Sequence, residues 1–167
     1  LDSMFSEHRY WHGNEPCHQI AYLFNYAGQP WKTQREVRHI METEYLNAPG
    51  GLSGNDDAGQ MSAWYVFSAM GFYPVCPGTP YYIIGSPSFP RMSIRLENGK
   101  TFTILAHNAN EKNVYIQSAR LNGKEYDKNY FTHQDIVQGG TLEFQMGPNP
   151  NPNWGASTLS LPPETMK

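Results

Sequence analysis

Apolar side chains recur with helical spacing through the first half of the chain. The spacing predicts three helices, over residues 16–28, 30–45 and 58–70. Proline suits the first turn of a helix, where its missing N–H has no partner to lose, and Pro16 stands at the first start. Glycine suits the C-terminal stop, and Gly28 stands at the end of the same stretch.

The third predicted helix has almost no polar face. Its apolar positions include Met61, Ala63, Trp64, Tyr65, Val66 and Phe67. A helix that is apolar all round is expected to be buried. Three helices cannot cover it on all sides, so they are expected to be the last hairpins of a larger helical barrel. Because the sequence starts abruptly at Leu1, we expect a fragment or processed chain, with the cover supplied from upstream rather than by another chain.

The pattern of residues in the second half of the chain predicts short β-strands. The expected strands are residues 81–84, 92–96, 101–105, 114–121 and 141–146. Asn-Gly pairs at 98–99 and 122–123 are strong hairpin signals. Evenly spaced strands with turn signals predict an antiparallel sandwich. The fold class is therefore α+β, with a helical region over residues 1–75 and a β-rich region over 76–167, whose last residues, rich in Pro and Asn, are expected to be irregular.

Composition narrows the choice of partner. The formal net charge of −3 gives no electrostatic reason to expect nucleic acid or a membrane surface. No apolar run reaches the roughly 20 residues that span a bilayer. Aromatic residues make up 14% of the chain, and their faces stack on sugar rings but also fill cores. Cys17 and Cys76 allow one disulfide or two buried thiols, and they identify no redox compartment.

Two segments concentrate oxygen-bearing side chains just before predicted helices, residues 12–16 and 54–60. Carboxylate and amide oxygens are the ligands that Ca²⁺ takes, and paired carboxylates also serve glycoside hydrolysis. Asn and Asp before a helix are equally its ordinary N-caps. Capping needs only one of the adjacent acids Asp56 and Asp57, and the second would be repelled by the first unless a cation or solvent relieved it.

The sequence resembles the family 92 glycoside hydrolases through nearly its whole length. The run 54–64, continuing to Gly-Phe-Tyr-Pro-Val at 71–75, is similar to the family's signature. So is Gly-Asn-Glu-Pro at 13–16, followed by residues 22–31. Residues 115–123 resemble the family's closing strands. The resemblance implies a β-sandwich followed by an (α/α)₆ barrel, of which this chain would hold the terminal helices and antiparallel β-sandwich strands.

The resemblance also implies an activity and a site. Members of this family are calcium-dependent exo-α-mannosidases that remove terminal mannose with inversion. By position Asp57 would be the catalytic general base, and Asn14, Glu15 and Asp57 would hold the calcium ion. Asn55 matches a position that is often acidic in relatives, which weakens a base role there and favours Asp57. Substrate contacts are expected from Trp11, His12, His18, Asn55 and Asp56, although a histidine near a helix start is more often a structural residue.

A general acid is also required, and no family motif surrounds Glu7, the acid nearest on the upstream side. We therefore expect this chain alone to lack the acid. The expected partners are a mannose-containing glycan and the N-terminal part of a parent enzyme. An α1,2-type activity is the working expectation, although linkage specificity depends on an aglycone pocket that this chain does not define. The resemblance further implies a secreted protein, periplasmic or extracellular.

Two alternative functions are consistent with the same residues. One is a non-catalytic carbohydrate-binding or accessory module with the sandwich as its working part. The other is a structural segment that packs against the rest of its parent. Calcium binding that depends on Glu15 and Asp57 distinguishes the enzyme from both.

Overall fold

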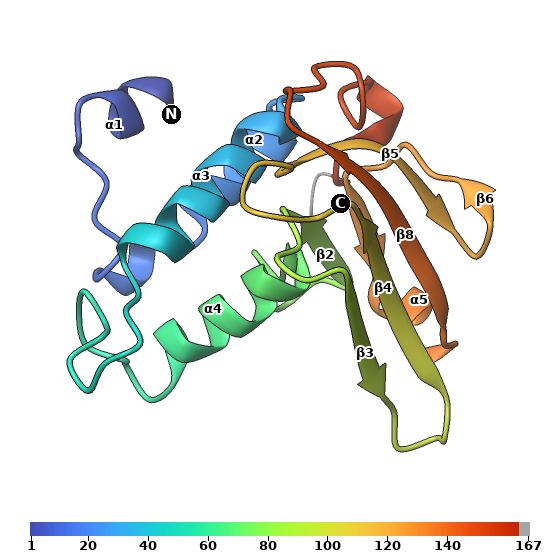
Figure 1. Ribbon diagram of the computed structural model, residues 1–167, viewed down its shortest axis with the longest axis horizontal. Coiled ribbons are helices and arrows are strands. Elements are labelled where there is room, and N and C mark those ends of the chain that lie inside the picture. The colour runs from blue at the N-terminus through green and yellow to red at the C-terminus, as the bar shows by residue number, and fades with distance from the viewer. Residues whose placement is uncertain (164–167) are drawn as a thin grey trace.

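The computed structural model describes residues 1–163. Helices gather on one side of the molecule and strands on the other (Figure 1). The helical elements before the sheets are α1 (Asp2–Ser6), the 3-10 helices η1 (Glu15–Cys17) and η2 (Ile20–Tyr22), α2 (Leu23–Tyr26), α3 (Pro30–Thr43) and α4 (Gln60–Met70). Helices α3 and α4 confirm the second and third predicted helices, with α4 starting two residues later than expected.

The first predicted helix is wrong as a continuous element, because the chain breaks it into η1, η2 and α2. In an α-helix the carbonyl of His18 would accept from the backbone N–H of Tyr22. Here that carbonyl accepts instead from the indole N–H of Trp64 at 2.9 Å. The backbone N–H of Tyr22 donates to the carbonyl of Gln19. A side chain from another helix has taken the place of a helical hydrogen bond, and nothing in the local sequence signals it.

The strands form two sheets. A three-stranded antiparallel sheet has the order β1 (Phe72–Tyr73), β2 (Tyr81–Ile84), β7 (Tyr130–Thr132). A five-stranded sheet has the order β3 (Arg91–Arg95), β4 (Thr101–His107), β8 (Gly140–Gly147), β5 (Tyr115–Leu121), β6 (Lys124–Glu125). A short helix α5 (His133–Val137) precedes β8, and the 3-10 helix η3 (Thr158–Ser160) lies in the tail. Part of the predicted irregular tail, residues 164–167, lies outside the described residues.

Both Asn-Gly turns are confirmed as hairpins, since β3 pairs antiparallel with β4 and β5 with β6. The expectation of a wholly antiparallel β region is wrong, because β4 and β8 pair in parallel. Parallel neighbours need a long crossover. Here β5, β6, β7 and α5 all lie between the two strands in the chain, which lets β8 return in the direction of β4. The α+β class with two sheets stands, whereas the (α/α)₆ barrel stays a prediction.

The helical and β-rich regions share a core across the predicted division at residue 75. Tyr22 and Trp64 pack in one buried cluster with Ile83 of β2. Two buried asparagines tie the regions together: the Asn25 amide donates to the carbonyl of Asn129 at 2.9 Å, and the Asn129 amide donates back to the carbonyl of Asn25 at 3.0 Å. The division into two domains stays a prediction. A continuous buried interface joins the two regions where the division is predicted.

Helix α4 is not buried all round in this chain. Trp64 has no exposed surface, but Tyr65 and Val66 on the opposite side are 39% and 55% exposed. Together with Leu46 and Leu52 they line an open apolar groove. Exposed apolar patches of this kind usually mark a binding surface. Within residues 1–163 no helix combines the length and apolar character needed to cross a bilayer. Both cysteines are free thiols, Cys17 half-buried and Cys76 exposed, so neither a disulfide nor a pair of buried thiols is found.

Candidate functional site

The two oxygen-bearing segments lie against each other. A β-carbon added to Gly13 would come 2.8 Å from the carbonyl oxygen of Ser53, and one added to Gly54 would overlap the backbone of Gly13. Contacts this close leave room only for a hydrogen atom, so glycine is needed at both positions. The segments 12–16 and 54–60 therefore meet through their backbones at Gly13 and Gly54.

Asp56 and Asp57 have different roles although they are adjacent. The Asp56 carboxylate accepts hydrogen bonds from the backbone N–H and the hydroxyl of Ser62, both at 2.9 Å. It thereby satisfies a free N–H in the first turn of α4. This is the helix-capping role that the sequence offered as the alternative to a functional one. The Asp57 side chain is exposed. A direct contact of Asp56 with substrate stays a prediction, as does the contact of the exposed Asn55.

Asp57 opens a stretch of left-handed backbone. The φ angle is +50° at Asp57, +56° at Ala58 and +98° at Gly59. This conformation is unfavourable by roughly 1–2 kcal/mol for residues other than glycine. Non-glycine residues held in this region cluster at functional sites, where the surrounding structure imposes the conformation. The backbone thus holds the Asp57 carboxylate out of the helix that follows it.

We expect Ala58→Gly to stabilise the folded chain by about 0.5–1 kcal/mol. Glycine adopts a positive φ without steric cost, and this gain exceeds its greater entropy when unfolded. Urea unfolding measures the difference. Ala63→Gly, at an exposed position inside α4 where φ is helical, serves as control and should destabilise by about 1 kcal/mol. Equal losses in the two variants would contradict strain at Ala58.

Asn14 and Glu15 stand at the start of η1 with exposed side chains. The Asn14 amide nitrogen lies 3.7 Å from Sγ of Cys17, which leaves its carbonyl oxygen for another partner. Within residues 1–163 no three His, Cys, Asp or Glu side chains are grouped closely enough to hold a metal ion. The predicted calcium set contains two carboxylates and one amide, and its oxygen-only chemistry fits Ca²⁺, which takes six to eight oxygens. Further oxygens must come from backbone, water, sugar or another segment.

A buried hydrogen-bond network lies beneath the two loops. The Tyr45 hydroxyl donates to the Met61 carbonyl at 3.0 Å, so it must accept from Nε2–H of His12 at 2.7 Å. Nδ1 of His12 then carries no proton and accepts from the Tyr10 hydroxyl at 2.7 Å. Burial, reinforced by the neighbouring His18, lowers the pKa of His12 to about 3. His12 is therefore a neutral residue that links the first loop to the start of α4.

His18 lies beside His12, with 4.6 Å between ring centroids, and neither histidine has exposed surface. Burial lowers the pKa of His18, opposed by a hydrogen bond to the His12 carbonyl and by the charges of Glu15 and Asp57. One imidazole is thus influenced by a carboxylate from each loop. The predicted sugar contacts of both histidines stay predictions, and their observed contacts are structural.

Trp11 is the exposed aromatic residue of the site, with 56% of its surface accessible. The edge of its indole ring lies over Gly13, where an added β-carbon would come within 2.6 Å of Cε2 and Cζ2. Glycine therefore lets the ring lie close to the backbone. An exposed, supported aromatic face suits stacking on a sugar ring. Its role in binding substrate stays a prediction.

Sequence reasoning missed the tyrosines of the site. Neither Tyr45, the last residue of the second predicted helix, nor Tyr10 was singled out as a residue of the site. Trp64 was assigned to the core of α4, where it lies, but its N–H also fixes the carbonyl of His18. No local pattern distinguishes a tyrosine that bonds a buried histidine from one that fills a core, so the signal was absent.

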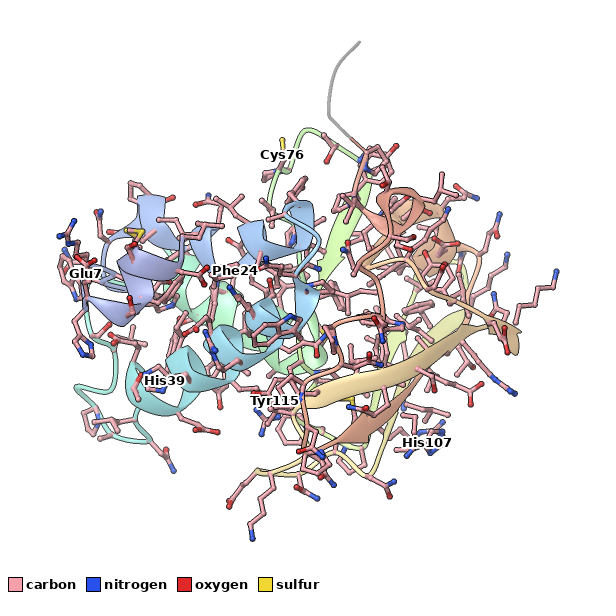
Figure 2. All side chains as sticks on the ribbon, turned by 90° about the horizontal axis from the view of Figure 1, so that it is seen from above. Glu7, Phe24, His39, Cys76, His107 and Tyr115 are labelled. Atoms are coloured by element: carbon pink, nitrogen blue, oxygen red, sulfur yellow. The ribbon has the colours of Figure 1, made fainter. Side chains whose placement is uncertain are left out.

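Glu7 lies at the outer end of the helical part, as Figure 2 shows. Its carboxylate forms an exposed ion pair with Arg9, two residues further on. An exposed carboxylate held by a neighbouring guanidinium is an ordinary surface ion pair. The position of Glu7 therefore gives no support to a catalytic role.

Comparison with known proteins identifies the class. The sequence profile described as the glycosyl hydrolase family 92 catalytic domain matches residues 1–148. A family 92 α-mannosidase from Bacteroides thetaiotaomicron has 48% sequence identity and a TM-score of 0.90, covering 94% of this chain and 21% of its own. A family 92 inverting mannosidase from the same organism has 47% identity and a TM-score of 0.87, covering 92% and 21%. A secreted glycosidase of Arthroderma benhamiae, itself uncharacterised, is 37% identical over 98% of this chain and 21% of its own length.

The fold of this chain is therefore one that family 92 glycoside hydrolases share. This chain belongs to glycosyl hydrolase family 92, as its sequence motifs predicted. The chain spans about a fifth of the length of the relatives that it matches.

Proposed function

We propose that this chain contributes the general base and part of the calcium site to an inverting, calcium-dependent exo-α-mannosidase that acts on mannose-containing glycans. The meeting of the two oxygen-bearing loops at Gly13 and Gly54 is the observation that carries this proposal. One similar enzyme is described as an inverting mannosidase, and a structure of another was obtained with mannoimidazole bound. The remaining parts of the enzyme are proposed to lie in a longer polypeptide.

In this proposal each residue has a role that its surroundings permit. Asp57, free of the capping bonds that occupy Asp56, accepts a proton from the attacking water. Asn14, Glu15 and Asp57 would hold calcium, which supplies positive charge and oxygen ligation for the vicinal hydroxyls of a terminal mannose. Trp11 offers an apolar face to the sugar. Inversion requires the acid and base carboxyl groups to be about 6.5–9.5 Å apart. The acid is proposed to come from a part of the enzyme outside this chain.

Calcium titration by calorimetry tests the proposal directly. We expect the chain to bind Ca²⁺, and Glu15→Gln and Asp57→Asn each to weaken binding by at least about tenfold, which is about 1.4 kcal/mol. Glu97→Gln, at an exposed position of the β3–β4 turn, is the matched control and should bind as the parent chain does. Binding that survives both substitutions in the site would exclude this calcium set.

The chain alone is expected not to hydrolyse mannobiose, because we propose that the general acid lies in another part of the enzyme. Release of mannose from α1,2-, α1,3- and α1,6-mannobiose, measured against the corresponding activity of a longer polypeptide containing this chain, tests both the missing acid and the α1,2 preference. Substantial turnover by the 167-residue chain would show that an acid is present.

We further propose that the enzyme acts outside the cytoplasm, in the periplasm or the medium, since glycans occur there and one relative is described as secreted. The accessory-module alternative places sugar binding on the β region. Sugar binding that persists in Glu15→Gln and Asp57→Asn would favour that alternative.

A further inference from the structure

Arg38 of α3 is a buried cation between the helical and β-rich regions. Only 8% of its surface is accessible. Nη1 donates to the carbonyl of Pro87 at 3.2 Å and Nη2 to the carbonyl of Asn110 at 3.4 Å, so the side chain ties α3 to the loops before β3 and after β4. Within residues 1–163 no carboxylate lies within ion-pair distance of this guanidinium. Buried charges are normally paired or fully hydrogen-bonded, so the bonding of Arg38 is incomplete.

Two open cavities give access to this guanidinium. They have volumes of about 460 and 390 Å³ and share Arg38, Ser88 and Glu111 as lining residues. A guanidinium has five N–H donors, and the two carbonyls occupy two of them. Because Arg38 lines both cavities, its remaining donors are available to a molecule there. No lining residue belongs to the loops at 12–16 and 54–60, so the cavities are not part of the calcium set proposed above.

The charges around the two cavities balance. Arg38 and Lys112 are cationic, Glu42 and Glu111 are anionic, and none of the four forms an ion pair with another. An anionic ligand would be repelled by the two acids, and a cationic one by the two bases. A neutral ligand with hydroxyl groups can donate to the carboxylates and accept from the guanidinium, so it suits both kinds of neighbour.

Tyr65 of α4 adds an apolar surface at the same place. It lines the smaller of the two cavities and is 39% exposed. Its ring lies against the ring of Tyr45, with 4.9 Å between the centroids, which supports it from one side. An aromatic face can pack on the C–H face of a sugar while the hydroxyl groups of the sugar bond to polar neighbours. An accessible aromatic ring beside balanced donors and acceptors is the chemistry that a neutral carbohydrate requires.

We propose that the cavities around Arg38 bind a neutral carbohydrate, with Tyr65 packing on the sugar ring and with Arg38 and Glu111 bonding its hydroxyl groups. Cavities of this size lie within the roughly 300–1,000 Å³ that is usual for small-molecule sites. The site holds glycan and takes no part in hydrolysis. The choice of a mannoside as its ligand rests on the proposed function.

NMR of the ¹⁵N-labelled 167-residue chain with added α1,2-mannobiose tests the proposal. We expect the Nε–H resonance of Arg38 and the backbone amide resonances of Ser88 and Glu111 to shift and to approach saturation. Tyr65→Ala is expected to weaken this binding by at least about fivefold, because the packing face is lost. Val66→Ala is the matched control, since Val66 is the exposed neighbour on α4 and lines neither cavity. Absent shifts, or equal losses in the two variants, would overturn the proposal.

Arg38→Lys separates binding from a purely structural role. Lysine keeps the positive charge but lacks the planar guanidinium with its several donors. We expect at least about fivefold weaker mannobiose binding by the folded variant, measured alongside its unfolding in urea. A structural role alone would lower the free energy of unfolding and leave the sugar affinity of the folded chain unchanged, which would contradict the proposal.

Mannose and mannuronic acid test the charge balance, because they differ by one carboxylate. The parent chain is expected to bind mannose more tightly than mannuronic acid, since Glu42 and Glu111 repel the added charge. Glu111→Gln, at an exposed position, should narrow this difference. Tighter binding of mannuronic acid by the parent chain would assign the cavities to an anion and exclude a site for neutral sugar.

The outcome is independent of the calcium result. Asp57→Asn is expected to weaken calcium binding and to leave the mannobiose shifts at Arg38 unchanged. Shifts lost in Asp57→Asn would mean that the sugar binds only with the calcium set, so this inference would fail while the proposed function stood. Shifts at Arg38 in a chain that binds no calcium would do the opposite. In a longer polypeptide containing this chain, labelled with ¹⁵N-arginine, the Arg38 shift should persist, and its loss would show that another segment fills the cavities.

Discussion

Substitution of Gly54 by alanine is expected to push the two oxygen-bearing loops apart and to abolish calcium binding. The added methyl group would overlap the backbone of Gly13, which cannot move aside as a flexible side chain would. Overpacking of this kind costs roughly 1–3 kcal/mol. We expect a loss of that size in urea unfolding, together with at least a tenfold weaker calcium affinity, which is about 1.4 kcal/mol. Because Gly54 has no positive φ, the effect comes from the contact alone.

Gly50→Ala provides the matched control, since a β-carbon at Gly50 meets no atom within 4 Å and its φ is not positive. This variant should keep both the stability and the calcium affinity of the parent chain. If Gly54→Ala bound calcium as tightly as Gly50→Ala, the closeness of the loops would have no bearing on the ion. The proposal that the loops form one site would then be wrong.

Acid is expected to unfold this chain well before the buried histidines are protonated in the folded state. The pKa of His12 is lowered to about 3 by burial, and that of His18 is lowered as well. A lowered histidine pKa means that the unfolded chain binds more protons below its ordinary value of about 6.5. The contribution of these neutral histidines to the free energy of unfolding is therefore fully present above about pH 6.5, and it is lost as the pH drops towards 3. For His12 alone the loss is roughly 3–5 kcal/mol over this window.

His12→Gln removes the titration of this group and should flatten the dependence of unfolding free energy on pH between 6.5 and 3. His39→Gln, at an exposed position of α3, is the matched substitution outside the buried network. The measurement is urea unfolding at a series of pH values. An unchanged slope in His12→Gln would show that His12 is not held neutral.

The exposed groove beside α4 bears on how the site is completed. Tyr65 and Val66 are apolar and accessible, and the groove they line with Leu46 and Leu52 follows directly on the loop that carries Asp57. A segment of a longer polypeptide that covered this groove would pack on α4, the helix that follows the loop of Asp57.

Local sequence determined several features correctly. The Asn-Gly turns that form the β3–β4 and β5–β6 hairpins, and the helix α3 that begins at Pro30, depend on the backbone preferences of a few neighbouring residues. The family was determined in the same way, because its motifs are contiguous. The choice of Asp56 or Asp57 as the capping residue was open in the sequence, since both stand before the same helix.

Tertiary contacts decided the rest. Trp64 interrupts the first predicted helix by taking the carbonyl of His18, and β8 returns parallel to β4 after a long crossover. The contact of Gly13 with Gly54, which makes one site of two motifs, joins segments distant in the sequence. Such contacts depend on where other elements pack, so no pattern of neighbouring residues encodes them. The sequence by itself identified the family and predicted the residues of the site, and the folded chain determined that the two loops carrying them meet at Gly13 and Gly54.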